Sequence, residues 1–165
     1  MYTDHMKQLN DESPAPTLGD PPATAENERR IDALAEVHTR VLDTIAGFEK
    51  TVDKAEPEFE KTAQTFLWVH RRHEEELATA LRRFGREPQD DGSFFATVNR
   101  AAIEVRSWFE EVSTNIMDRV IEGEKHVLES YEAAAAAGLD ASTRTMLERH
   151  AEEIRTLLDA NAIRR

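Results

Sequence analysis

Hydrophobic positions recur every three or four residues along most of this chain, which is the spacing of one face of an α-helix. The pattern predicts four long helices, over about residues 28–52, 57–84, 116–137 and 140–162. It also predicts a shorter helix over about residues 93–112. No stretch alternates between hydrophobic and polar residues as a half-buried strand would. The sequence therefore predicts an all-α protein.

Breaks between the hydrophobic stripes indicate how the helices connect. Pro57, between two glutamates, suits a first helical turn, and Gly138 suits the end of a helix. Tight turns near residues 56 and 139 would thus make two antiparallel hairpins. A helix over 93–112 is about 30 Å long and can lead back along a bundle. We therefore expect a four-helix bundle of two antiparallel hairpins, joined by a crossover that contains the shorter fifth helix.

Residues 1–27 differ from the rest of the chain. They contain four of the six prolines and five acidic residues against one basic residue, and their only large aliphatic residues are Leu9 and Leu18. Such a segment buries too little apolar surface to offset the entropy lost on ordering. We expect a flexible acidic tail over 1–27 and a helical bundle over 28–165.

The composition removes several function classes. The 165 residues include 33 acidic and 21 basic side chains, a net charge of −12, and no cysteine. Disulfides, thiolate metal sites and thiol catalysis are excluded, and the acidic balance argues against nucleic acid and anionic membranes as partners. No segment approaches 18 apolar residues, and the N-terminus lacks the apolar core of a signal peptide. We therefore expect a cytoplasmic protein.

Four histidines occupy stripe positions where an apolar residue would be expected, namely His38, His70, His73 and His150. In a hairpin that turns near residue 56, facing residue numbers sum to roughly 113, so His38 faces about residue 75. A turn near 139 places His150 opposite about residue 129, which a crossover brings to the height of about residue 72. We expect all four histidines within about one to two helical turns of a common level.

Two glutamates lie close to that level. Glu124 interrupts an otherwise apolar face, and Glu49 borders the stripe of the first helix. Imidazole and carboxylate groups suit Fe, Mn or Zn, and bundle interiors can hold such ions. One interpretation is therefore a metal-binding bundle with oxidase or metal-storage activity, whose ligands come from His38, His70, His73, His150, Glu49 and Glu124.

The other interpretation is a polar layer without metal, which fixes helix register and in which Glu124, Tyr131 or Asn161 satisfies the imidazoles. Di-metal carboxylate bundles carry Glu-x-x-His on two helices. Here Leu67, His70 and Leu147 stand three residues before His70, His73 and His150. The reverse order does occur, as His73-x-x-Glu76 and His150-x-x-Glu153. A pH-sensing role of the histidines is a third interpretation.

Catalytic motifs are missing from the rest of the sequence. The serines show no triad pattern, and the six glycines are scattered rather than gathered into a phosphate-binding loop. We therefore expect no catalytic residues and no bound cofactor beyond the alternative of Fe, Mn or Zn. Whether the chain is an enzyme is left open by these patterns, and the balance is against it.

Three segments carry a family resemblance: HRRHEEELATALRRFGREPQDDGSF, ATVNRAAIEV and IEGEKHVLESYEAAA. With Gly47-Phe48, Leu81 to Gly92 and Glu122-Gly123-Glu124, they make residues 30–160 resemble a bacterial ferritin-like four-helix-bundle family catalogued as a domain of unknown function. The resemblance implies a ferritin-like fold and a stress-associated role, and no established activity. Members often carry a His-Asp pair in the last helix, where this chain has Leu158-Asp159. We favour a non-catalytic homodimeric bundle, with the metal-binding bundle as the alternative.

Overall fold

The structure is a computed structural model that describes residues 23–52, 57–89 and 116–162. It contains four helices: α1 (Ala23–Val52), α2 (Pro57–Arg83), α4 (Ile116–Ala136) and α5 (Ala141–Ala162). No strand occurs within these residues, which confirms the predicted all-α class for the described part of the chain. The predicted helix over 93–112 lies outside the described residues.

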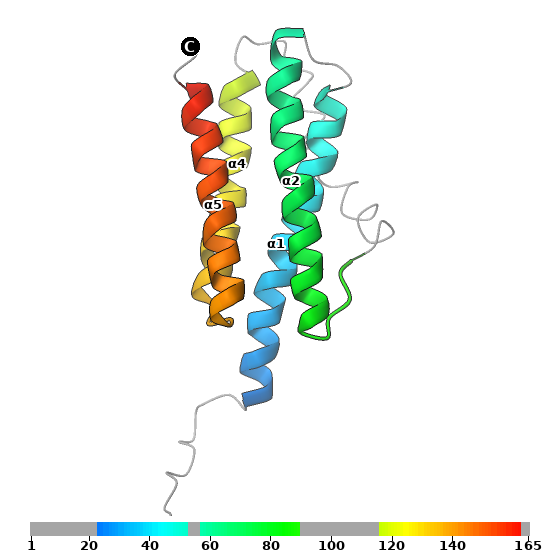
Figure 1. Cartoon of the computed structure of the whole chain (residues 1–165), viewed down its shortest axis with the longest axis vertical. Coiled ribbons are helices and arrows are strands. Elements are labelled where there is room, and N and C mark those ends of the chain that lie inside the picture. The colour runs from blue at the N-terminus through cyan, green and yellow to red at the C-terminus, as the bar shows by residue number, and fades with distance from the viewer. Residues whose placement is uncertain (1–22, 53–56, 90–115, 163–165) are drawn as a thin grey trace, which may run out of the picture.

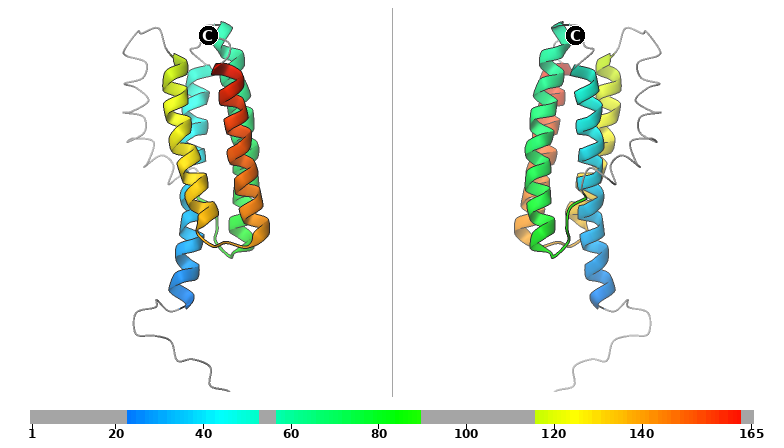
Figure 2. Two further views of the ribbon diagram at one scale, coloured as in Figure 1. Left: turned by 90° about the vertical axis from the view of Figure 1, so that its left-hand side faces the viewer. Right: turned by 90° about the vertical axis from the view of Figure 1, so that its right-hand side faces the viewer.

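The four helices pack side by side as a bundle (Figure 1). α1 packs against α2 and α4, and α5 packs against α4 and more loosely against α2, so α2 and α4 lie diagonally across the bundle. Each hairpin, α1–α2 and α4–α5, is antiparallel (Figures 1 and 2). α2 and α4 run in the same direction, so the end of α2 and the start of α4 lie at opposite ends of the bundle.

The helix ends follow the local sequence. α2 begins at Pro57, as predicted, because proline lacks the amide hydrogen that a first helical residue cannot use. Gly85 (φ 75°) and Gly138 (φ 85°) follow α2 and α4 in the left-handed conformation that glycine adopts without strain. The start of α1 differs from the prediction: it lies at Ala23 rather than near residue 28, with Glu26 placed favourably in its first turn.

Asp140 caps α5. Its Oδ1 accepts hydrogen bonds from the backbone amides of Ser142 (3.0 Å) and Thr143 (3.1 Å). Hydrogen bonds from the Ser142 and Thr143 hydroxyls and the Thr143 amide hold the pKa of Asp140 well below its usual range. The carboxylate thus satisfies amides at the start of the helix that have no partner within it.

The core has two apolar parts with a polar layer between them. The larger part joins side chains from all four helices, among them Leu34, Leu77, Tyr131 and Leu147. The smaller part contains Phe48, Ala63 and Phe66. His70 stacks on Phe48 of the smaller part (5.8 Å between ring centroids), and His73 contacts Tyr131 of the larger part. Among the described helices, none has the length and apolar character needed to cross a membrane.

Candidate functional site

All four candidate histidines lie in the core, where each is at most 1% exposed. Their heights agree with the predicted register. His38 was expected opposite residue 75, and its Nε2 lies 3.1 Å from Oε1 of the neighbouring Glu74. Residue 129 was expected opposite His150 and level with residue 72; Tyr131 contacts the ring of His150 (5.6 Å) and that of His73 (5.9 Å). The histidines of three helices therefore form one layer with Tyr131 and Glu124 of α4.

His73 and His150 form a reciprocal arrangement between α2 and α5, which we call the clasp together with Glu76 and Glu153. The two imidazoles stack with centroids 3.8 Å apart and planes 10° from parallel. His73 Nε2 lies 2.8 Å from Glu153 Oε2, and His150 Nε2 lies 3.2 Å from Glu76 Oε2. Because each helix carries His-x-x-Glu and the two run antiparallel, each histidine meets the glutamate of the other helix.

Tyr131 completes the hydrogen bonding of His73. Its hydroxyl lies 3.1 Å from His73 Nδ1, so the hydroxyl donates to Nδ1 while Nε2–H donates to Glu153. This network assigns the neutral Nε2–H tautomer to His73. Burial and the charge of Glu124 raise the pKa of Tyr131 well above its usual value. The phenol therefore stays protonated at neutral pH and remains a donor.

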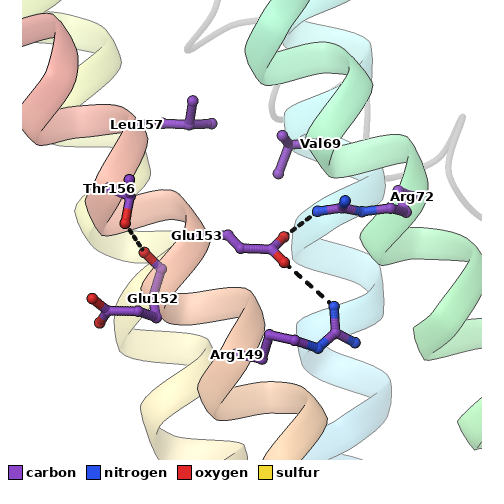
Figure 3. A pocket seen from close by; sticks show the side chains of 7 residues that line it. All are labelled: Val69, Arg72, Arg149, Glu152, Glu153, Thr156 and Leu157. Carbon is purple, nitrogen blue, oxygen red and sulfur yellow. Dashed lines mark hydrogen bonds and ion pairs between the residues drawn. The ribbon is translucent and has the colours of Figure 1, made fainter.

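Two arginines neutralise the carboxylates of the clasp. Arg149 forms ion pairs with Glu76 and with Glu153 (3.4 Å), and Arg72 forms an ion pair with Glu153. Figure 3 shows Glu153 between the guanidinium groups of Arg72 from α2 and Arg149 from α5. Partial burial raises the pKa of both carboxyls, but hydrogen bonds from Arg149 to Glu76 and from His73 to Glu153, with the nearby positive charges, bring both below the usual value.

The clasp histidines are neutral at pH 7. Burial, followed by the proximity of His150, lowers the pKa of His73 to about 3. Burial lowers the pKa of His150 to about 4, although Glu76 acts in the opposite direction. Each imidazole can therefore donate through one nitrogen and accept through the other without carrying a charge.

His70 and Glu124 form the second arrangement, which we call the inner pair. His70 Nε2 lies 2.8 Å from Glu124 Oε1, and this contact crosses the bundle diagonal from α2 to α4. Both side chains are buried, at 0% and 1% exposure. Glu124 Oε2 and His70 Nδ1 are buried and have no hydrogen-bond partner among the residues that the structure describes. Within the described ranges, no lysine or arginine forms an ion pair with Glu124.

The structure separates the six predicted metal ligands. His70 and Glu124 form the inner pair, His73 and His150 belong to the clasp, and His38 contacts Glu74. Glu49 lies on the surface, where its half-exposed carboxylate pairs with Arg71 (2.8 Å). In residues 23–52, 57–89 and 116–162, no three histidine, aspartate or glutamate side chains are arranged to hold one metal ion.

Some residues of the layer were not predicted. Glu74, Arg72 and Arg149 contact it, although the hydrophobic pattern of the sequence does not single them out. Glu74 could have been anticipated, because the helix register estimated from the turn near residue 56 places His38 opposite the adjacent residue 75. The two arginines lie outside the hydrophobic stripes and reach the layer through long side chains, which a stripe pattern does not detect.

A shallow groove of about 460 Å³ runs along the outside of the clasp between α2 and α5. Val69 and Leu157 face each other across it, and Arg72, Arg149 and Glu153 form its charged side (Figure 3). The remaining lining residues are Glu152 and Thr156. Because its arginines already pair with glutamates, the groove offers no free charge within the described residues for a charged ligand.

Comparison with known families matches residues 29–137 to a family described as a domain of unknown function, DUF2383. This chain belongs to the DUF2383 family. The matched part contains His38, His70, His73 and Glu124 and stops before α5, which supplies His150 and Glu153 to the clasp. The unknown-function family expected from the sequence is thereby confirmed. No curated protein and no solved structure matches the chain.

Proposed function

We propose that this member of the DUF2383 family is a non-catalytic, ferritin-like helical bundle with a structural or stress-associated role in the cytoplasm. The observation that carries the proposal is the pairing of the buried histidines. Each of the four contacts a glutamate, and each is at most 1% exposed. Catalysis requires reactive groups that a substrate can reach, whereas this layer is arranged to join helices.

The test combines metal content with oxidase activity. Protein purified without chelator is analysed for iron and manganese, and oxygen consumption is followed after addition of Fe(II). We expect neither metal at stoichiometric amounts and no oxygen consumption above that of buffer. Stoichiometric redox metal together with protein-dependent Fe(II) oxidation would contradict the non-catalytic role and support an oxidase.

The ferritin-like topology forms part of the proposal. It is supported by the parallel directions of α2 and α4, whose consecutive ends lie at opposite ends of the bundle (Figure 2). A connection between them must return along the bundle, and the pattern over 93–112 predicts a helix there. Proline costs a helix interior about 3 kcal/mol and glycine about 1 kcal/mol relative to alanine. We expect Ala102→Pro to lower the free energy of unfolding well beyond Ala102→Gly; equal, negligible effects would contradict the fifth helix.

A homodimer is the second part of the proposal, and the exposed Trp68 supports it. Trp68 lies on α2 with 62% of its surface exposed, and the guanidinium of Arg72 lies 4.9 Å from its ring centroid. Exposed tryptophan beside arginine is typical of protein interfaces. Sedimentation equilibrium should give twice the chain mass of 18.8 kDa. Trp68→Glu should shift the equilibrium to monomer, whereas Lys61→Glu, also exposed on α2, should not.

A further inference from the structure

The groove between α2 and α5 combines apolar side chains with charges that balance. Val69 and Leu157 face each other across it (Figure 3). Its charged lining residues are two arginines and two glutamates: Arg72, Arg149, Glu152 and Glu153. Each of these arginines already forms an ion pair with a glutamate. An occupant of the groove therefore gains free energy mainly by bringing an apolar group that covers Val69 and Leu157.

One side chain beside the groove is both apolar and exposed. Among the described residues, Trp68 is the large hydrophobic side chain that stands out at the surface, with 62% of its area exposed. It directly precedes Val69 in α2 but does not line the groove of its own chain. The guanidinium of Arg72, which does line the groove, lies 4.9 Å from the centroid of the tryptophan ring. The ring and the groove therefore share one face of the molecule and lie at nearly the same height.

We propose that Trp68 of a second copy of this chain occupies the groove, and that the groove of that copy receives Trp68 of the first. This inference rests on the homodimer of the proposed function and identifies the surface that forms it. Two-fold dimers need a patch that is complementary to itself. A two-fold axis that passes near Arg72 exchanges ring and groove, because Arg72 lies beside both. The groove volume of about 460 Å³ is within the roughly 300–1,000 Å³ of sites that hold a whole small ligand, so an indole ring fits.

The charges of the groove favour a second copy over a strongly basic or acidic partner. The chain carries a net charge of −12, so two copies repel each other on average. At the groove, two glutamates match two arginines, so the faces of two copies can meet there without net repulsion. A basic partner would be attracted to the chain as a whole, but it would find no surplus of negative charge among the lining residues of the groove. Tryptophan and arginine are also the residues that most often supply the binding energy of protein interfaces.

Sedimentation equilibrium of the full-length protein at about 1–100 μM tests this surface. Trp68→Ala removes the ring, and Thr156→Arg fills the groove from α5 without changing Trp68. Two-fold symmetry makes each contact twice, so a substitution that weakens one contact about tenfold weakens the dimer about a hundredfold. We expect the dimer dissociation constant to increase by this factor in both variants. If Thr156→Arg dimerised as well as the parent protein, the proposal would be overturned.

Thr44→Arg is the matched control for Thr156→Arg. The hydroxyl of each threonine bonds to the backbone carbonyl four residues earlier, so both substitutions make the same local change in a helix. Thr44 lies on α1, which contributes no residue to the groove. Thr44→Arg should change the dimer dissociation constant by less than about twofold. An equal loss of dimer in both variants would show that added positive charge, rather than filling of the groove, separates the copies, and it would contradict the proposal.

Tryptophan fluorescence separates the groove from the homodimer itself. The chain contains two tryptophans, so Trp108→Phe leaves Trp68 as the sole indole emitter. In the dimer its ring leaves water for the groove, and we expect the emission maximum to move to longer wavelength on dilution or on adding Thr156→Arg. Emission that stays constant while dilution dissociates the dimer would overturn the groove and leave the homodimer standing. A monomer at about 100 μM would overturn both and leave the groove to an apolar segment of a different protein.

Discussion

The clasp and the inner pair use the same two residue types in different surroundings. In the clasp, the glutamates lie at the edge of the layer, about one-third exposed, and within reach of Arg72 and Arg149. In the inner pair, Glu124 lies on the diagonal of the bundle, and no arginine or lysine of the described residues reaches it. Position in the bundle, rather than residue type, therefore decides whether the glutamate of a histidine–glutamate contact also has an arginine beside it.

Acid should break the clasp, and this is the largest effect that we expect. The pKa of His73 is lowered to about 3 and that of His150 to about 4, against 6.5 in the unfolded chain. Below pH 6.5 the unfolded state therefore binds more protons than the folded state, so stability is fully present above pH 6.5 and is lost as the pH falls towards 4. Each histidine should lower the free energy of unfolding by about 2 kcal/mol between pH 7 and 5.

Urea titrations at pH 7, 6 and 5 and constant ionic strength measure this loss. His150→Gln should show a smaller loss over the same range, because one of the two titrating groups is gone. His126→Gln, at an exposed histidine, should lose as much as the parent protein. If His150→Gln and the parent protein lost the same free energy, the stability of the clasp would not depend on the neutral state of His150.

Removing the hydroxyl of Tyr131 gives a second test of the difference between the clasp and the inner pair. Tyr131→Phe leaves Nδ1 of His73 buried without a partner and should cost about 1–3 kcal/mol. In double-mutant cycles measured with urea, Tyr131→Phe should couple by more than about 0.5 kcal/mol to Glu153→Gln, since both side chains bind His73. It should be nearly additive with Glu124→Gln. Coupling of equal size in both cycles would show that the two arrangements act as one network.

The heights in the bundle could be predicted because the helical rise is constant. An estimate from turn positions alone placed His38 opposite residue 75 and His150 opposite residue 129, and the contacts are made by Glu74 and Tyr131. The same regularity explains why the all-α class was predicted, and the positive φ of Gly138 explains why this glycine was expected to end a helix. An error of one or two residues is less than one helical turn.

The hydrophobic pattern does not reveal in which direction around the helix axis a side chain points, or how far it reaches. Glu49 has the right height but follows Phe48, which points into the core, so its own side chain turns by about 100° and pairs with Arg71 at the surface. Arg72 and Arg149 lie outside the apolar stripes and reach the layer through flexible side chains. The start of α1 at Ala23 was missed because hydrophobic spacing begins only with Ile31, whereas the helix extends through polar turns before it.

Salt should produce the smallest effect and distinguish the two arrangements by their exposure. Glu76→Gln removes the ion pair with Arg149, and Glu153→Gln removes the ion pairs with Arg72 and Arg149. Each substitution at the edge of the layer should cost at most about 1 kcal/mol at low ionic strength. About 1 M NaCl screens such partly exposed pairs, so the difference from the parent protein should shrink in urea titrations. The effect of Glu124→Gln should be the same in both salt concentrations, because its carboxylate is buried away from mobile ions. If salt altered the Glu124→Gln effect as much as the Glu153→Gln effect, the inner pair would be open to solvent, and the contrast between the two arrangements would be lost.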